Sequence, residues 1–69
     1  MPEKLQVHLK VARARAGLTQ EELASRVSVT RKTINTIERG HFVPSTLLAL
    51  KLARALGTAV EELFSLAEE

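Results

Sequence analysis

The chain has 69 residues, 45% of them hydrophobic and 26% charged, a composition that predicts one small folded domain and excludes a disordered segment. It has no cysteine, so disulfides cannot stabilise it. The longest apolar run, residues 47–50, is far shorter than a membrane span, and no secretion signal is recognisable. We therefore expect a cytoplasmic protein without membrane contact.

Charge is distributed unevenly along the chain. All ten Lys and Arg residues lie within residues 1–56, whereas four of the eight Glu residues fall within residues 57–69. A basic body of this kind indicates either an anionic partner such as nucleic acid or an ordinary solvated helical surface.

Glycines and a proline divide the chain into helix-sized pieces at Gly17, Gly40, Pro44 and Gly57. No segment suggests strand alternation, so the predicted fold class is all-α, with one domain over residues 1–69. The five expected helices cover residues 3–16, 20–27, 31–39, 46–56 and 59–66.

Apolar residues at helical spacing predict the buried face of each helix. The expected inward residues are Leu5, Leu9, Ala12 and Ala16; Leu23, Ala24 and Val27; Ile34 and Ile37; Ala49, Leu50, Leu52, Ala53 and Leu56; and Val60, Leu63 and Phe64.

Hydroxyl residues stand where helices are expected to begin. Thr19 followed by Glu22 matches a capping box, and Thr58 followed by Glu61 matches a second one. Thr30 and Ser45 are expected to cap the third and fourth helices.

The third helix is expected to present a polar face. Projection at 100° per residue places Ile34 and Ile37 inward, and it turns Arg31, Lys32, Asn35, Thr36 and Arg39 outward. Two short helices joined by a tight turn form a helix-turn-helix, which also occurs as plain structure in helical proteins. The outward face carries cations, an amide and a hydroxyl but no acid. These groups suit the major groove of DNA, whereas a merely solvated face usually mixes both signs of charge.

In these features the chain resembles the Cro-and-repressor type of helix-turn-helix domain, the XRE family, from about Leu9 to Phe64. The resemblance rests on Arg13, residues 17–24, residues 30–34, residues 37–40, Pro44-Ser45 and Leu56-Gly57. It implies a compact five-helix, lambda-repressor-like fold that binds double-stranded operator DNA, generally as a homodimer.

The resemblance also implies residue roles. Base-reading positions correspond to Arg31, Lys32 and Thr36, with Asn35 a weaker candidate at the groove edge. Backbone contacts correspond to Thr19, Gln20, Thr30, Thr33, Arg39, Gly40, His41 and Arg13.

Arg13 and Glu38 match a pair that forms a partly buried salt bridge in some members of the family, and both flank the apolar faces of their helices. The alternative is two unrelated surface charges. Ser28 occupies a turn position that often adopts a left-handed conformation. If its φ is positive, it costs about 1 kcal/mol relative to Gly.

Surplus apolar residues suggest self-association. We favour a surface formed by the fifth helix and the end of the fourth, with Leu47, Phe64 and Leu66 as its candidate residues. The competing stripe on the first helix contains Val7, Val11 and Ala14. His8 and His41 are the only histidines, so no metal site, cofactor or catalytic set is expected.

The sequence thus predicts a transcriptional regulator that is not an enzyme and that binds a near-palindromic operator as a homodimer. One alternative is an antitoxin or controller of the same fold whose main partner is another protein. Another is a helical interaction module without DNA binding.

Overall fold

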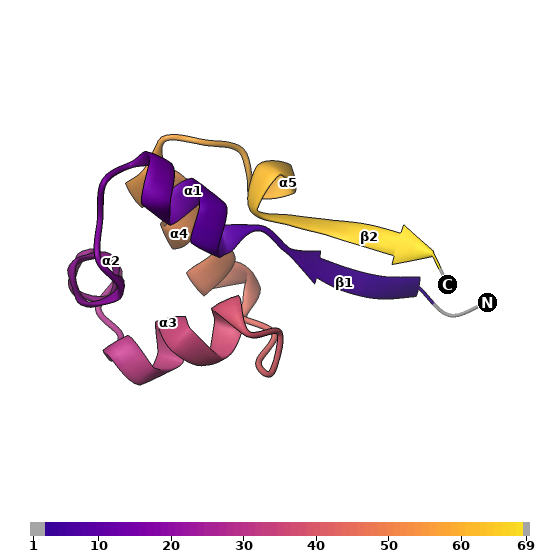
Figure 1. The fold of residues 1–69 in the computed structure, drawn as a ribbon, viewed down its shortest axis with the longest axis horizontal. Helices are drawn as coiled ribbons and strands as arrows, with labels where there is room; N and C mark the ends of the chain where they lie inside the picture. Colours follow the sequence, from indigo (N-terminus) through magenta and orange to yellow (C-terminus); the bar gives the residue numbers. More distant parts are fainter. Residues whose placement is uncertain (1–2, 69) are drawn as a thin grey trace.

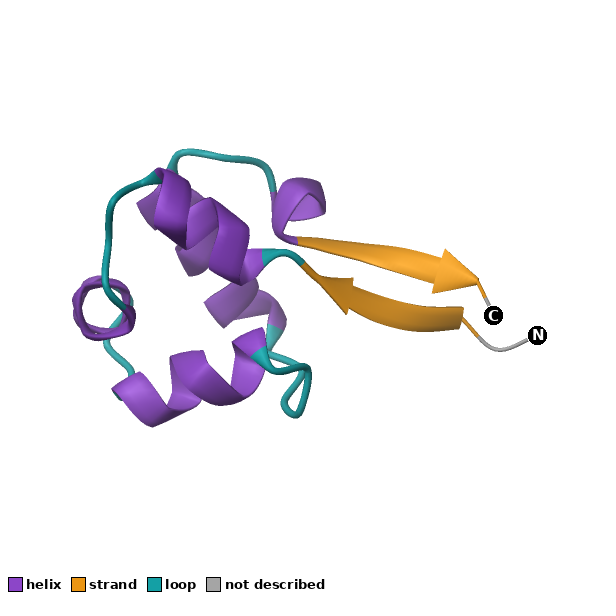
Figure 2. Cartoon of the chain, viewed as in Figure 1, coloured by secondary structure: helices purple, strands orange, loops and turns teal. Residues whose placement is uncertain are grey.

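Residues 3–68 are described by the computed structural model, in which one strand precedes and one follows five helices along the chain, and the two strands lie side by side (Figure 1). The elements are β1 (Glu3–Val7), α1 (Leu9–Arg15), α2 (Gln20–Arg26), α3 (Arg31–Glu38), α4 (Thr46–Leu56), α5 (Val60–Leu63) and β2 (Phe64–Glu68). Residues 1, 2 and 69 of the expected 1–69 domain lie outside the described part. Figure 2 shows the helices gathered on one side and both strands extending from them.

The first and last described segments form a two-stranded sheet. β1 pairs antiparallel with β2, and the register places Leu5 opposite Leu66 and Val7 opposite Phe64. The all-α prediction is therefore wrong at both ends, because the helices expected over 3–16 and 59–66 shorten to Leu9–Arg15 and Val60–Leu63. Residues 4–7 do alternate polar and apolar side chains, but their strand depends on a partner from the opposite end of the chain.

Every helix contributes to the core. The buried residues are Leu9, Leu23, Ala24, Val27, Ile34, Ile37, Leu52, Ala53 and Leu63, all of them predicted to face inward. Three other inward predictions are wrong: Leu5 is 40% exposed in β1, Leu50 is 55% exposed on α4, and Ala16 is exposed at the end of α1.

Side-chain caps fix where three helices begin. The Thr19 hydroxyl accepts from the Glu22 N–H at 3.0 Å, and the Glu22 carboxylate accepts from the Thr19 N–H at 2.8 Å, so the first capping box is confirmed. Thr30 and Ser45 cap α3 and α4 as predicted. The second capping box is wrong, because α5 begins after Ala59 and has no side-chain cap.

No helix of residues 3–68 is long and apolar enough to cross a membrane.

Candidate nucleic-acid interface

A helix-turn-helix unit holds the predicted reading helix. α2 and α3 are joined by residues 27–30, and the Val29 N–H donates to the Ala24 carbonyl at 3.0 Å across this turn. Ser28 has a φ of 62°, the left-handed conformation anticipated for its position. Ile34 and Ile37 are fully buried, so α3 has one fixed inner face and one fixed outer face.

The outer face of residues 31–39 carries positive charge. Arg31, Lys32 and Arg39 are exposed, while Asn35 and Thr36 are half-buried beside them. Glu38, the single acid in this range, is not exposed and is paired inside the chain. The solvent side of α3 therefore presents cationic and hydrogen-bonding groups without an exposed carboxylate, a combination suited to base edges and phosphates.

Arg13 joins α1 to α3 through the salt bridge that the sequence predicts. Its Nε donates to Glu38 Oε2 at 2.6 Å, its Nη2 donates to Glu38 Oε1 at 3.2 Å, and its Nη1 donates to the Leu18 carbonyl at 2.8 Å. The side chains of Arg13 and Glu38 are only 14% and 3% exposed. The hydrogen bond to Glu38 raises the pKa of Arg13 above its ordinary value.

Gln20 belongs to the same hydrogen-bonded group. Its Nε2 donates to Glu38 Oε1 at 3.0 Å and to Asn35 Oδ1 at 3.2 Å. Both hydrogens of this amide are thus used between α2 and α3. A phosphate contact through Gln20 stays a prediction, and it requires one of these two bonds to be exchanged.

The threonines of α3 have their hydroxyls turned toward the chain. The Thr36 hydroxyl donates to the carbonyls of Thr33 and Lys32, at 2.9 and 3.1 Å. The hydroxyls of Thr30 and Thr33 lie 3.1 Å apart and bond to each other. Thr36 therefore offers DNA its methyl group more readily than its hydroxyl.

The loop after α3 turns back along the helix. Gly40 has a φ of 76°, and the His41 N–H donates to the Thr36 carbonyl at 2.9 Å. Arg39, Gly40 and His41 are exposed there, as backbone-contacting residues must be. Phe42 follows them and is 46% exposed, but it is absent from the sequence-predicted site. The sequence did contain a signal for it, because this aromatic residue directly follows three residues that are predicted to contact DNA.

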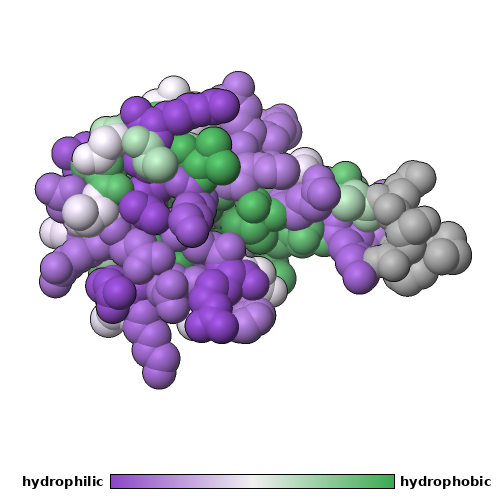
Figure 3. Space-filling view, viewed as in Figure 1, coloured by the Kyte–Doolittle hydropathy of each residue, from purple (hydrophilic) through white to green (hydrophobic). Residues whose placement is uncertain are grey.

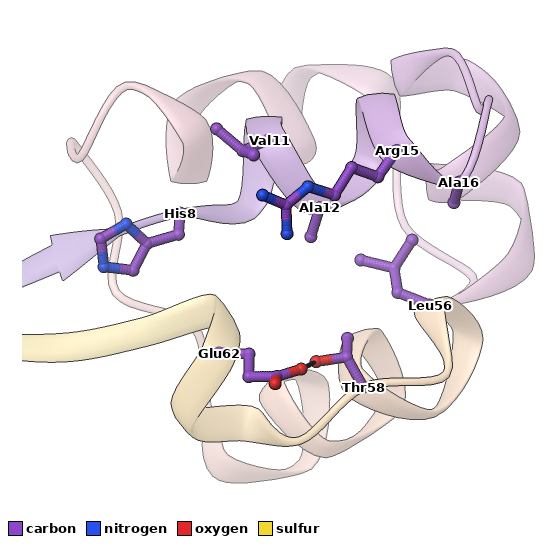
Figure 4. A pocket seen from close by; sticks show the side chains of 8 residues that line it. All are labelled: His8, Val11, Ala12, Arg15, Ala16, Leu56, Thr58 and Glu62. Atoms are coloured by element: carbon purple, nitrogen blue, oxygen red, sulfur yellow. Dashed lines mark hydrogen bonds between the residues drawn. The ribbon is translucent and has the colours of Figure 1, made fainter.

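A separate hollow of about 590 Å³ lies between α1 and the segment where α4 ends and α5 follows (Figure 4). Arg15 reaches over it from α1, while Glu62 and Thr58 face each other on the opposite wall, where the Thr58 hydroxyl donates to the Glu62 carboxylate. His8 at its edge bonds to the Ser65 hydroxyl at 2.8 Å. None of the predicted DNA-contacting residues lines this hollow. Within residues 3–68, no group of three His, Asp or Glu residues is placed to hold a metal ion.

The predicted self-association residues divide between two elements. Leu47 on α4 and Leu66 on β2 are each 65% exposed, and Phe64 at the start of β2 is half-buried. The competing stripe is divided in the same way, because Val7 lies in β1, whereas Val11 and Ala14 are both exposed on α1.

Comparison with known proteins agrees with this geometry. A family described as helix-turn-helix matches residues 9–63, the range that contains all five helices. The chain belongs to this family. The match confirms the resemblance to the Cro-and-repressor type, and both β1 and β2 lie outside the matched range.

Relatives of this helix-turn-helix chain include an uncharacterised HTH-type transcriptional regulator of Bacillus subtilis, YgzD, which is 49% identical over 61 residues. That match covers 88% of this chain and 92% of the relative. An uncharacterised HTH-type transcriptional regulator of Methanothermobacter thermautotrophicus is 53% identical over 58 residues, covering 83% of this chain and 84% of the relative.

Among solved structures, the restriction-modification controller protein C.AhdI of Aeromonas hydrophila is similar, with a TM-score of 0.74 and 37% identity. The similarity covers 78% of this chain and 82% of that chain.

Proposed function

We propose that the protein is a sequence-specific transcriptional regulator that binds a near-palindromic operator as a homodimer. The outer face of α3 carries this proposal. It exposes Arg31, Lys32 and Arg39 without an acid, on a helix whose opposite face is fully buried. Membership of a helix-turn-helix family whose members are named transcriptional regulators supports the same reading.

Base reading falls to the first turns of α3. Arg31 and Lys32 donate to guanine acceptors, and Thr36 offers its methyl to thymine. Asn35 already accepts a hydrogen bond from Gln20, so its amide nitrogen is the group it offers to a base at the groove edge. Because the recognition helix enters the groove by its N-terminal end, Arg31 and Lys32 reach deepest.

Phosphate contacts supply affinity and orientation. The surfaces that flank α3 provide them, namely the start of α2, the cap of α3 and the loop after it. The residues we assign are Thr19, Gln20, Thr30, Thr33, Arg39, Gly40 and His41. Arg13 contributes through guanidinium hydrogens that Glu38 and Leu18 leave unused.

The dimer contact lies on an apolar surface shared by α4 and the sheet. A shallow groove of about 240 Å³ is lined by Leu5, Leu50, Phe64, Val43, Pro44, Thr46, Ala49 and Val60. Leu47 on α4 and Leu66 on β2 add two further exposed apolar side chains to these elements. Figure 3 shows apolar surface where the helices meet the sheet. We call the set Leu5, Leu47, Leu50, Phe64 and Leu66 the apolar surface. An isolated two-stranded ribbon is marginal in water, so a second copy that covers it stabilises both.

Selection of bound sequences from a random DNA pool at fixed salt tests the proposal. We expect an inverted repeat whose half-sites are one helical turn, about 34 Å, apart. Recovery of sequences without a common motif contradicts sequence-specific binding, and recovery of a single unrepeated site contradicts the symmetric dimer.

Two substitutions separate base reading from phosphate binding. Arg31→Ala is expected to relax preference at one base pair by about 1–3 kcal/mol, whereas Arg39→Ala, which removes an assigned phosphate contact, weakens all sequences alike. Lys51→Ala removes an exposed charge from α4 and is the control that leaves base preference unchanged. An unaltered preferred sequence in Arg31→Ala contradicts the role assigned to that residue.

A second candidate keeps the fold but makes another protein the main partner. The similarity to a structure named a restriction-modification controller protein agrees with a controller role, although that name specifies no partner. Two results together would support that candidate over the operator-binding regulator: a protein encoded beside this one co-purifies with it, and this chain binds DNA only weakly and without sequence preference.

A further inference from the structure

A hollow beside the reading helix has not yet been given a role, although four of the five residues that line it are assigned to DNA contacts. It has a volume of about 310 Å³ and lies between α3 and the loop that follows it. Lys32, Thr33 and Thr36 line it from α3, and His41 and Phe42 line it from the loop. Because Lys32 and Thr36 are assigned to base edges, the hollow opens on the surface that faces DNA.

The chemistry of this hollow is apolar at its walls. The hydroxyl of Thr36 is bonded to two carbonyls of α3, and the hydroxyl of Thr33 is bonded to Thr30. The groups left to meet a ligand are therefore two methyl groups, the half-exposed ring of Phe42 and the aliphatic stem of Lys32. The charged end of Lys32 and the imidazole of His41 supply the polar rim.

The hollow is held open by backbone bonds. The His41 N–H donates to the Thr36 carbonyl at 2.9 Å, and the Gly40 N–H donates to the Ile37 carbonyl at 3.0 Å. These bonds tie the start of the loop to the last turn of α3. Phe42 is thus positioned before DNA arrives, which reduces the ordering entropy lost on binding.

We propose that this hollow receives the 5-methyl group of a thymine in the major groove, and that Phe42 is a specificity-determining residue. Among the groups on the major-groove edges of DNA bases, the thymine methyl is the apolar one, and threonine methyls and phenylalanine rings are side chains that contact it. The hollow exceeds a methyl group in volume and so admits the base edge that carries it. This inference rests on the proposed operator binding.

The test removes the methyl group alone. Each thymine of the operator recovered from the random pool is replaced by deoxyuridine in both half-sites, and affinity is measured at fixed salt. At one position we expect affinity to fall about fourfold for each methyl removed, which corresponds to the transfer of one buried methyl group. In Phe42→Ala the same replacement is expected to change affinity by less than about twofold.

Two further variants control for indirect effects. Val11→Ala shortens another exposed apolar residue, on α1 and outside the hollow, and is expected to retain the full deoxyuridine penalty. Phe42→Leu keeps an apolar wall and is expected to retain part of the penalty. Thermal melts of all three variants verify that they fold.

Three outcomes overturn the inference while leaving operator binding intact. They are an operator with no fixed thymine in its half-site, no deoxyuridine penalty at any position, and a penalty that Phe42→Ala leaves unchanged. Failure to recover any common sequence contradicts the proposed function itself, and the inference falls with it. The two failures are therefore distinguishable.

Discussion

Arg13 is the residue on which the orientation of α3 depends. It bonds to both oxygens of Glu38 and to the carbonyl of Leu18, so one guanidinium links α1, α3 and the segment between α1 and α2. Both members of the pair are largely removed from water. Loss of either member leaves the other charge without its counter-charge, with only neutral partners such as Gln20 or the Leu18 carbonyl remaining. That loss is more destabilising than loss of an exposed pair.

We predict that Arg13→Ala lowers the free energy of unfolding by about 3 kcal/mol, because it leaves the buried carboxylate of Glu38 without its counter-charge. In a chain of this length the midpoint of thermal unfolding falls by more than about 10 °C. Arg15→Ala removes an exposed arginine from the same helix and serves as the control. Glu38→Gln, which keeps a hydrogen-bonding oxygen, is expected to destabilise less. Equal melting temperatures for Arg13→Ala and Arg15→Ala would falsify the structural role of the pair.

The stability that Glu22 contributes at the start of α2 depends on pH. The Thr19 backbone N–H bonds to its carboxylate and lowers the pKa of Glu22 below its ordinary value of 4.5, and the Thr19 side chain adds to this effect. A carboxylate with a lowered pKa contributes stability above its unfolded pKa and loses it as the pH falls through its folded pKa.

Glu22→Gln is therefore expected to melt at a lower temperature than the wild type at neutral pH, and the difference is expected to shrink as the pH falls below 4.5. Thermal melts from neutral to acid pH measure it. Glu21→Gln removes a charge from the same exposed turn without touching the capping box. A wild-type advantage that persists unchanged in acid contradicts the prediction.

At the scale of elements, local chemistry made the middle of the chain predictable. The capping side chains of Thr19, Thr30 and Ser45 bond to backbone within three residues, so sequence spacing reveals them. The apolar spacing of Ile34 and Ile37 identified the buried face of α3 in the same way, and with it the outward charges.

The two ends of the chain were not predictable by such patterns. Residues 3–7 contain residues that favour helix, and Leu5 and Leu9 stand one helical turn apart. The pairing of β1 with β2 overrides this preference, since Leu5 finds its neighbour in Leu66 at the other end of the chain. The bonds from Gln20 to Asn35 and Glu38 escaped prediction for a similar reason, because they depend on how α2 packs against α3.

The turn between α2 and α3 contains removable strain. Ser28 has a φ of 62°, and a side chain is less stable there than glycine. We predict that Ser28→Gly raises the free energy of unfolding by about 0.5–1 kcal/mol, the relief of strain being partly offset by the greater freedom of glycine in the unfolded chain. Urea denaturation measures the change.

Ser25→Gly is the matched control for this substitution. Ser25 is exposed, as Ser28 is, but it lies within α2. Inside a helix, glycine is about 1 kcal/mol less favourable than alanine, the best helix former, and it is also less favourable than serine. The two variants should therefore shift the urea midpoint in opposite directions. Destabilisation by both contradicts the assignment of strain to Ser28.

At the scale of the whole molecule, the apolar surface is where we propose that two copies of the chain associate. Leu50 and Leu66 are 55% and 65% exposed, although one lies on α4 and the other on β2. Local periodicity assigned Leu50 to the core of the single chain. Its exposure is consistent with a core completed by a second copy.

We predict that Leu66→Glu raises the dissociation constant of the dimer by roughly thirtyfold, about 2 kcal/mol, because a carboxylate replaces an apolar side chain that the proposed dimer buries. Sedimentation velocity over a range of concentrations measures the shift. Val11→Glu places the same charge at an exposed apolar position on α1 and is expected to leave association unchanged. Loss of association in Val11→Glu alone would instead place the contact on α1.

The pairing of β1 with β2 also has a geometric consequence. The register sets Glu3 opposite Glu68, so the backbones at the two ends of the described chain lie about 5 Å apart. Both ends project from the same pole, at the end of the sheet farthest from the helices (Figure 1). A donor and an acceptor fluorophore attached to the two ends would therefore report the separation of the strands while leaving α3 free to bind.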